Sequence, residues 1–167
     1  GMRFGDFLRN RILQPLGMQD TDFFVASGKL DRFANCYQVK DGQLVVQDDA
    51  FASAFAAPPA LESGGGGLVG TAGDYMRFCR MLLNGGSLDG TQLLSPKTVT
   101  LMTMNHLPGG VQMTDIMPST ILFNETGYAG VGFGLGVAVT VDVPATRLPG
   151  SVGEFAWGGA AGTAFFV

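Results

Sequence analysis

The sequence is poor in the residues that bind metals or build disulfide frameworks. It has one histidine, His106, and two cysteines, Cys36 and Cys79, which are widely separated along the chain. A typical zinc site needs four such ligands at close spacing, so we expect no metal site. His106 follows a predicted helix and is expected to have a structural role at the C-terminus of that helix. Cys79 falls on an apolar helix stripe, which is typical of a small buried thiol.

Charged residues are also scarce, and acidic residues outnumber basic ones. Charged residues make up 14% of the 167 residues, and the net charge is −4. This balance is not expected in a protein that binds nucleic acid, and no run of lysine and arginine indicates a membrane surface as a partner. The uncharged residues 128–141 are too few and too rich in glycine for a membrane span. No signal-peptide pattern opens the chain at Gly1-Met2-Arg3, so the sequence indicates no compartment.

Helical periodicity and capping signals predict three helices. They cover residues 4–15, 71–84 and 95–105. The second opens on the capping box Thr71-x-x-Asp74, and the third opens on Ser95-Pro96 with serine as the cap and proline at the first helical position.

Strand signals lie on both sides of these helices. Residues 33–39 and 43–47 flank Asp41-Gly42, which predicts a hairpin with a two-residue turn. Large apolar residues occupy every second position of residues 131–141, and this alternation predicts one long strand with a small-residue face. Residues 155–167 are expected to form a second long strand, antiparallel to the first. The order of elements favours an α+β fold over an alternating β-α-β fold.

The middle of the last predicted strand consists of glycine and alanine. Trp157-Gly158-Gly159 is followed by Ala160-Ala161-Gly162, with large apolar residues on either side. Glycine inside a strand costs conformational entropy. Such a run therefore marks a place where another group approaches the backbone closely.

A second glycine-rich segment precedes the middle helix. Gly65-x-Gly67-x-x-Gly70 matches the dinucleotide-binding fingerprint in its letters. That fingerprint must follow a buried strand within a β-α-β unit, whereas this segment follows a loop that contains Pro58-Pro59. We interpret it as a flexible loop that leads into the helix, and we expect no cofactor.

Four segments, taken in order, resemble the C-terminal half of the serine β-lactamase, D,D-peptidase and family VIII esterase superfamily. They are residues 7–21, 65–75, 93–96 and 132–163. The resemblance implies a partial β-lactamase/transpeptidase-like fold in which antiparallel strands pack with helices. It also implies that residues 1–167 form a single partial domain that is incomplete at both ends.

The resemblance also implies a site. In that superfamily a serine in S-x-x-K attacks the substrate carbonyl to form an acyl-enzyme, while the lysine and a tyrosine in Y-x-N move the proton. A third motif, K-T-G, H-x-G or W-x-G, faces the serine from a sheet edge. The matching residues Trp157, Gly158 and Gly159 would line the acyl pocket, and the N–H of Ala160 would be one of two oxyanion donors. Tryptophan in place of a cation favours a small acyl ester or amide over a β-lactam as substrate.

The motifs for the nucleophile and the base are missing from this sequence. No serine has lysine three positions later, and no tyrosine has asparagine two positions later. We therefore expect no catalytic residue within the chain. We also expect it to lack the N-terminal part with S-x-x-K and Y-x-N, and the closing C-terminal strands and helix, of a serine hydrolase. Such a chain would be inert in isolation.

Two other interpretations remain open from the sequence. The chain is alternatively a non-catalytic binding or interaction module derived from the same fold, or an unrelated α+β structural domain. A pocket that still binds acyl compounds would separate the first of these from the second. In every case the apolar residues 165–167 predict an unpaired strand edge and self-association through it.

Overall fold

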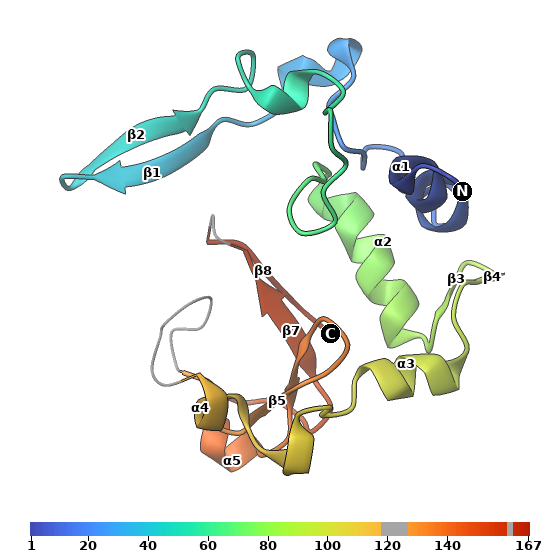
Figure 1. The fold of residues 1–167 in the computed structure, drawn as a ribbon, viewed down its shortest axis with the longest axis vertical. Coiled ribbons are helices and arrows are strands. Elements are labelled where there is room, and N and C mark those ends of the chain that lie inside the picture. The colour runs from blue at the N-terminus through green and yellow to red at the C-terminus, as the bar shows by residue number, and fades with distance from the viewer. Residues whose placement is uncertain (118–126, 160–161) are drawn as a thin grey trace. The chain divides into compact units, whose positions relative to one another are not determined.

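A computed structural model describes residues 1–117, 127–159 and 162–167. The chain forms two compact units, Gly1–Phe78 and Cys79–Val167 (Figure 1). Helix α2 (Ala72–Leu83) runs from the first unit into the second. Helices and antiparallel strands occur together, which confirms the predicted α+β class. No helix in the described ranges is both long enough and apolar enough to cross a membrane.

The first unit begins with a helix that changes type midway. α1 (Phe4–Leu8) is α-helical, and η1 (Arg9–Leu13) continues it with the wider hydrogen-bond spacing of a π-helix. The chain turns away at Gly17, which has a φ of 69° and donates its N–H to Gln14 O at 3.0 Å. The predicted helix is therefore confirmed, with turns in place of its last residues.

A hairpin follows at the predicted place. β1 (Cys36–Lys40) and β2 (Gln43–Asp48) pair antiparallel. Asp41 and Gly42 both have positive φ, 53° and 75°, as a tight two-residue turn requires. The short 3₁₀ helices η2 (Ser27–Arg32) and η3 (Ala54–Ala56) lie before and after the hairpin in the chain.

One buried carboxylate ties the start of α2 to the segment that follows the first helix. Thr71 Oγ1 accepts a hydrogen bond from Asp74 N–H at 3.1 Å, which is one half of the predicted capping box. The Asp74 carboxylate accepts bonds from the N–H of Asp20 at 2.7 Å and the hydroxyl of Thr21 at 2.9 Å. Asp74 is only 9% exposed. Its carboxylate therefore fixes two segments that are distant in the sequence.

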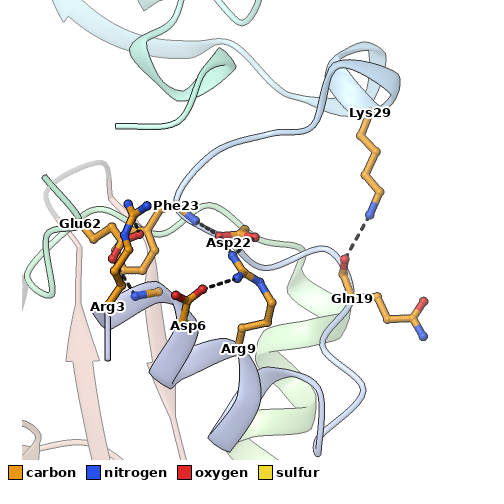
Figure 2. Close-up of polar contacts among 9 residues, drawn as sticks. Arg3, Asp6, Arg9, Gln19, Asp22, Phe23, Lys29 and Glu62 are labelled. Carbon is orange, nitrogen blue, oxygen red and sulfur yellow. Dashed lines mark hydrogen bonds and ion pairs between the residues drawn. The ribbon is translucent and has the colours of Figure 1, made fainter. Parts of the chain in front are cut away.

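Ion pairs connect the first helix to later segments of the unit (Figure 2). Arg9 contacts Asp6 at 3.0 Å and Asp22 at 3.1 Å, and Arg3 contacts Glu62 at 2.9 Å. These side chains are partly exposed, and such pairs contribute only about 0–1 kcal/mol each to stability. Their main effect is to fix where these segments contact one another.

Asp20 forms a further pair of contacts, with Lys29 and Arg32 of η2. Hydrogen bonds from Arg32 and Lys29 lower the pKa of Asp20 from 3.8 to about 2. Because this pKa is lower in the folded chain, the contacts stabilise the fold above about pH 4, and this contribution is lost as the pH falls toward about 2. We expect the urea-unfolding midpoints of the wild type and the Asp20→Asn variant to converge over that range. A difference that stays constant down to about pH 2 would contradict this role of Asp20.

The second unit contains short elements and a four-stranded sheet. The elements outside the sheet are β3 (Ser87–Leu88), β4 (Thr91–Gln92), α3 (Pro96–Met102), η4 (Pro108–Gly110), α4 (Met113–Ile116) and α5 (Val143–Thr146). Ser95 Oγ accepts a hydrogen bond from Thr98 N–H at 3.1 Å, which confirms the predicted cap of α3. α3 ends at Met102 and not near Asn105, because Met102 O accepts the N–H of Leu135 at 2.8 Å and so joins the helix end to the sheet.

The sheet has the order β5-β6-β7-β8, with every neighbouring pair antiparallel. Its strands are β5 (Val131–Phe133), β6 (Ala138–Thr140), β7 (Phe155–Gly158) and β8 (Ala164–Phe166). The predicted antiparallel pairing of residues 131–141 with residues 155–167 is confirmed, because β6 of the first region pairs with β7 of the second. The prediction of two long strands is wrong, since each region folds back on itself as a hairpin.

The reversal between β5 and β6 has a clear physical cause. Gly134 donates its N–H to Val137 O at 2.8 Å, and Gly136 has a φ of 93°. An added Cβ at Gly134 would collide with the carbonyl oxygen of Met102. The reversal also places Val139 directly opposite Gly132, so these two residues share a face of the sheet. The prediction that large residues occupy one face and small residues the other is therefore wrong.

Candidate functional site

Trp157 and Gly158 lie in β7, within the sheet of the second unit. Trp157 is paired with Phe165 of β8, and Gly158 with Ala164. The indole is half-buried, and its ring centroid lies 5.2 Å from that of Phe133 at an interplanar angle of 75°. This edge-to-face contact fixes the orientation of the indole against β5.

Gly159 begins the turn that joins β7 to β8. Its N–H donates to Thr163 O at 2.7 Å, and Gly162, with a φ of 76°, donates its N–H to Gly159 O at 3.0 Å. Gly159 and Gly162 therefore lie where the chain reverses and not in the middle of a strand, which corrects the sequence interpretation. Ala160, the predicted oxyanion donor, lies outside the described residues.

The close approach that glycine at position 159 permits comes from Thr163. A Cβ added to Gly159 would lie 2.5 Å from Thr163 Oγ1. Any larger residue at this position would displace that side chain. The sequence pattern correctly indicated that a group approaches this backbone, and Thr163 is such a group within the chain.

An apolar cluster lies beside the indole. Its buried members are Met113, Tyr128, Val131 and Ala138, and Leu107, Met117, Phe133 and Trp157 pack against them. Burial raises the pKa of the Tyr128 phenol. The described side chains of this cluster therefore surround Trp157 with mainly apolar groups, and none of them is a cation.

Asn105 organises this region, and the sequence analysis missed it. Its side-chain Oδ1 accepts the N–H groups of Leu107 and Phe133, both at 3.1 Å, and its Nδ2 donates to Val111 O at 3.0 Å. Gly132 leaves room for this side chain, because an added Cβ would collide with Asn105. In the sequence, the glycine at position 132 was therefore the signal that another side chain approaches β5.

His106 and the glycine-rich segment 65–70, the other candidates from the sequence, make contacts within the fold. His106 Nε2 lies 2.7 Å from Leu101 O near the end of α3, and the backbone N–H of His106 donates to Phe133 O at 2.8 Å, as expected of a residue with a structural role. In the glycine-rich segment, an added Cβ at Gly67 would lie 2.6 Å from Ser63 O and 3.0 Å from the Phe23 ring, so the segment is closely packed. Across the described ranges, no group of three or more His, Cys, Asp and Glu side chains is arranged to hold a metal ion.

Two curated proteins are similar to most of this chain. Protein Rv1367c of Mycobacterium tuberculosis (strain ATCC 25618 / H37Rv) is 38% identical over 156 residues, which are 92% of this chain and 37% of that protein. The chain therefore spans little more than a third of the length of the curated relatives it matches.

Solved structures with related folds include a hydrolase and a synthase. EstCE1, described as a hydrolase with promiscuous acyltransferase activity, matches 97% of this chain and 42% of its own with a TM-score of 0.73 and 25% identity. The LovD6 mutant of simvastatin synthase from Aspergillus terreus matches 95% of this chain and 40% of its own with a TM-score of 0.74 and 25% identity. These similarities confirm the predicted β-lactamase/transpeptidase-like fold. A family model described as Beta-lactamase matches residues 1–167, and the chain belongs to that family.

Proposed function

We propose that this chain is part of a β-lactamase-like serine hydrolase that cleaves esters or amides through an acyl-enzyme. In this proposal Trp157, Gly158 and Gly159 line the acyl pocket, and the N–H of Ala160 is one of two oxyanion donors. The nucleophilic serine and its base belong to another part of the protein. The 37% share of the M. tuberculosis relative that the chain matches supports this division.

The observation that carries the proposal is the position of Trp157-Gly158-Gly159 at the end of β7, where the strand enters a turn. Gly158 and Gly159 carry no side chains of their own, which favours the approach of a reacting carbonyl to N–H donors at this turn, although Thr163 Oγ1 already lies close to Gly159. Removing one oxyanion donor typically lowers a rate by about 10²–10³-fold. A small structural change at this turn would therefore have a large effect on catalysis.

The surroundings of Trp157 favour esters over β-lactams. Leu107, Met117 and Phe133 pack on the same cluster as the indole. Such a wall gains free energy by burying an apolar acyl chain. The described residues of this cluster include no cation to pair with the carboxylate of a β-lactam, and burying an unpaired carboxylate is costly.

Trp157 supplies a direct test, because it is the only tryptophan in the chain. We expect methyl hexanoate to shift the emission of the isolated chain in a saturable way and benzylpenicillin to leave it unchanged. The control is the double variant Trp157→Phe/Phe51→Trp, which moves the reporter to a residue that is 72% exposed in the first unit. Equal responses from the two reporter positions would contradict the proposed pocket.

The same preparation tests whether the isolated chain is inert. We expect neither a fluorophosphonate nor benzylpenicillin to form an adduct detectable by mass spectrometry, since no serine here has a lysine three positions later. A stoichiometric mass increase would overturn the assignment of the nucleophile to another part of the protein.

The proposal also includes self-association through β8. This strand is the last in the order β5-β6-β7-β8, and Phe166 is 76% exposed. A charge on an edge strand opposes pairing with a second copy, so Phe166→Lys should reduce concentration-dependent association in sedimentation velocity. Val152→Lys alters an equally exposed residue outside the strands, 70% exposed, and should have no effect. A wild type that stays monomeric at high concentration would contradict this prediction.

A further inference from the structure

A cavity of about 120 Å³ lies on one face of the four-stranded sheet, within the second unit. Ala138 of β6 and Ala156 of β7 are paired across the two strands, and both line the cavity. Residues that are directly opposite each other share a face of the sheet, so these small side chains form one side of the cavity. Val131 of β5 lines it as well, together with Leu148 and Pro149 from the segment between α5 and β7. Most of the lining is therefore apolar.

One carboxylate, that of Glu154, lines the same cavity. Glu154 is half-buried and directly precedes β7. A Cβ added to Gly150 would lie 3.1 Å from Glu154 Oε2, so the carboxylate lies against the backbone of this segment. Within the described ranges it accepts no hydrogen bond and forms no ion pair, and Arg147 is the only lysine or arginine in residues 98–167. Because a carboxylate that is partly removed from water is unfavourable without a partner, the cavity favours a cation.

A hydroxyl lies on the neighbouring strand, next to Glu154. Thr140 of β6 lines the cavity, and its N–H donates to the carbonyl oxygen of Glu154 at 2.8 Å. The Thr140 hydroxyl has no hydrogen-bond partner among the residues that the structure describes, whereas the hydroxyl of Thr146 donates to Val143 O at 2.8 Å. The Glu154 carboxylate and the Thr140 hydroxyl together offer three oxygen acceptors. A primary ammonium group has the matching number of N–H donors.

We propose that this cavity binds a small primary alkylammonium ion. The ammonium group lies between Glu154 and Thr140, and the alkyl group lies over Ala138 and Ala156, where its burial is favourable. An apolar cavity of about 150 Å³ holds a benzene ring, so a cavity of about 120 Å³ suits an alkyl group of about four carbons. The site does not depend on the proposed hydrolase activity.

The composition of the cavity distinguishes this ligand from other cations and from neutral molecules. Ca²⁺ takes about six to eight oxygen ligands and Mg²⁺ requires an octahedron, whereas Glu154 and Thr140 supply three oxygens. The described ranges also contain no group of three or more His, Cys, Asp and Glu side chains that could hold a metal ion. An uncharged ligand would leave the carboxylate without a partner. The ligand therefore needs both a charge and an apolar body.

Butylammonium and 1-butanol provide the test, because they share an alkyl chain and differ in the charged group. Binding of each to the isotope-labelled chain at pH 7 is followed by NMR at the amides of Thr140, Gly150 and Glu154. We expect butylammonium to shift these signals in a saturable way and to bind about 3- to 30-fold more tightly than 1-butanol, the effect of a charge-assisted hydrogen bond at a partly exposed group. Equal dissociation constants, or no shift with butylammonium, would overturn the proposal.

Glu154→Gln tests the carboxylate, since glutamine keeps the size of the side chain and removes its charge. This variant should bind butylammonium about 3- to 30-fold more weakly and bind 1-butanol as the wild type does. Asp31→Asn is the matched control, because it removes one negative charge from an exposed residue of the first unit. It should leave both dissociation constants unchanged. Equal effects of the two variants would show that net charge alone attracts the cation, and would contradict the site.

A second variant and a second cation complete the design. If Glu154→Gln perturbs amide signals throughout the sheet, Thr140→Val provides the measurement, since it removes one acceptor and should weaken butylammonium binding by about 2- to 10-fold. Unchanged binding in this variant would overturn the assigned position of the ammonium group. Magnesium chloride at the same ionic strength should leave the three amide signals in place. A saturable shift by Mg²⁺ would overturn the assignment to an organic cation.

Discussion

Replacing Gly130 with alanine should destabilise the second unit by about 2–6 kcal/mol, the sum of backbone strain and overpacking. Gly130 has a φ of 74°, and an added Cβ would collide with the carbonyl oxygen of Asp142. The glycine cannot move away easily. Its carbonyl accepts the N–H groups of Val141 and Asp142 at 2.8 and 3.1 Å, and its N–H donates to Gln112 Oε1 at 2.8 Å.

Gly136→Ala is the matched control for this substitution. Gly136 has a φ of 93°, but an added Cβ would meet nothing within 4 Å. This variant should show the strain alone, about 1–3 kcal/mol. Urea unfolding followed by Trp157 fluorescence reports on the second unit, which contains the only tryptophan. Equal losses in the two variants would contradict the collision at Gly130.

Asp74→Ala should have a comparably large effect on the first unit, about 2–4 kcal/mol. The substitution leaves the N–H of Asp20 and the hydroxyl of Thr21 without their common acceptor. Each unsatisfied buried group costs about 1–3 kcal/mol. Asp20 and Thr21 are both partly exposed, so water replaces some of the lost hydrogen bonds. The expected loss of stability therefore lies in the lower part of the sum of the two costs.

Asp74→Asn is the corresponding control, since the amide keeps one oxygen acceptor of nearly the same size. It should lose less stability than Asp74→Ala. Hydrogen exchange at the Asp20 amide provides the local measurement: exchange should accelerate strongly in the alanine variant and less in the asparagine variant. Unchanged protection of that amide in Asp74→Ala would show that the carboxylate does not hold it.

Elements defined by local signals were predictable from the sequence. The turn at Asp41-Gly42 and the cap at Ser95 depend on residues within a few positions of each other, and both were predicted correctly. The capping box at Thr71 was half correct, because the carboxylate of Asp74 binds groups more than fifty positions earlier. Sequence spacing does not encode such a distant partner.

The two long strands were predicted wrongly for a related reason. An alternation that contains glycine at every second position fits an extended strand and also a hairpin with glycine in its turn. The choice between them depends on Met102, whose carbonyl occupies the space beside Gly134. The candidate site shows the same division: the motif located Trp157 by its letters, whereas Gly132 gave only an indirect signal for Asn105, and the approach of Thr163 to Gly159 is visible only in space.

The strand order β5-β6-β7-β8 also bears on how the sheet forms during protein synthesis. Each strand pairs with the one that precedes it in the chain. When a strand leaves the ribosome, its partner has already been made, and no strand must wait for a distant segment. Contacts between neighbours in sequence carry a small loop-closure cost and favour rapid folding. The sheet that carries Trp157 can therefore assemble one strand at a time, in the order of translation.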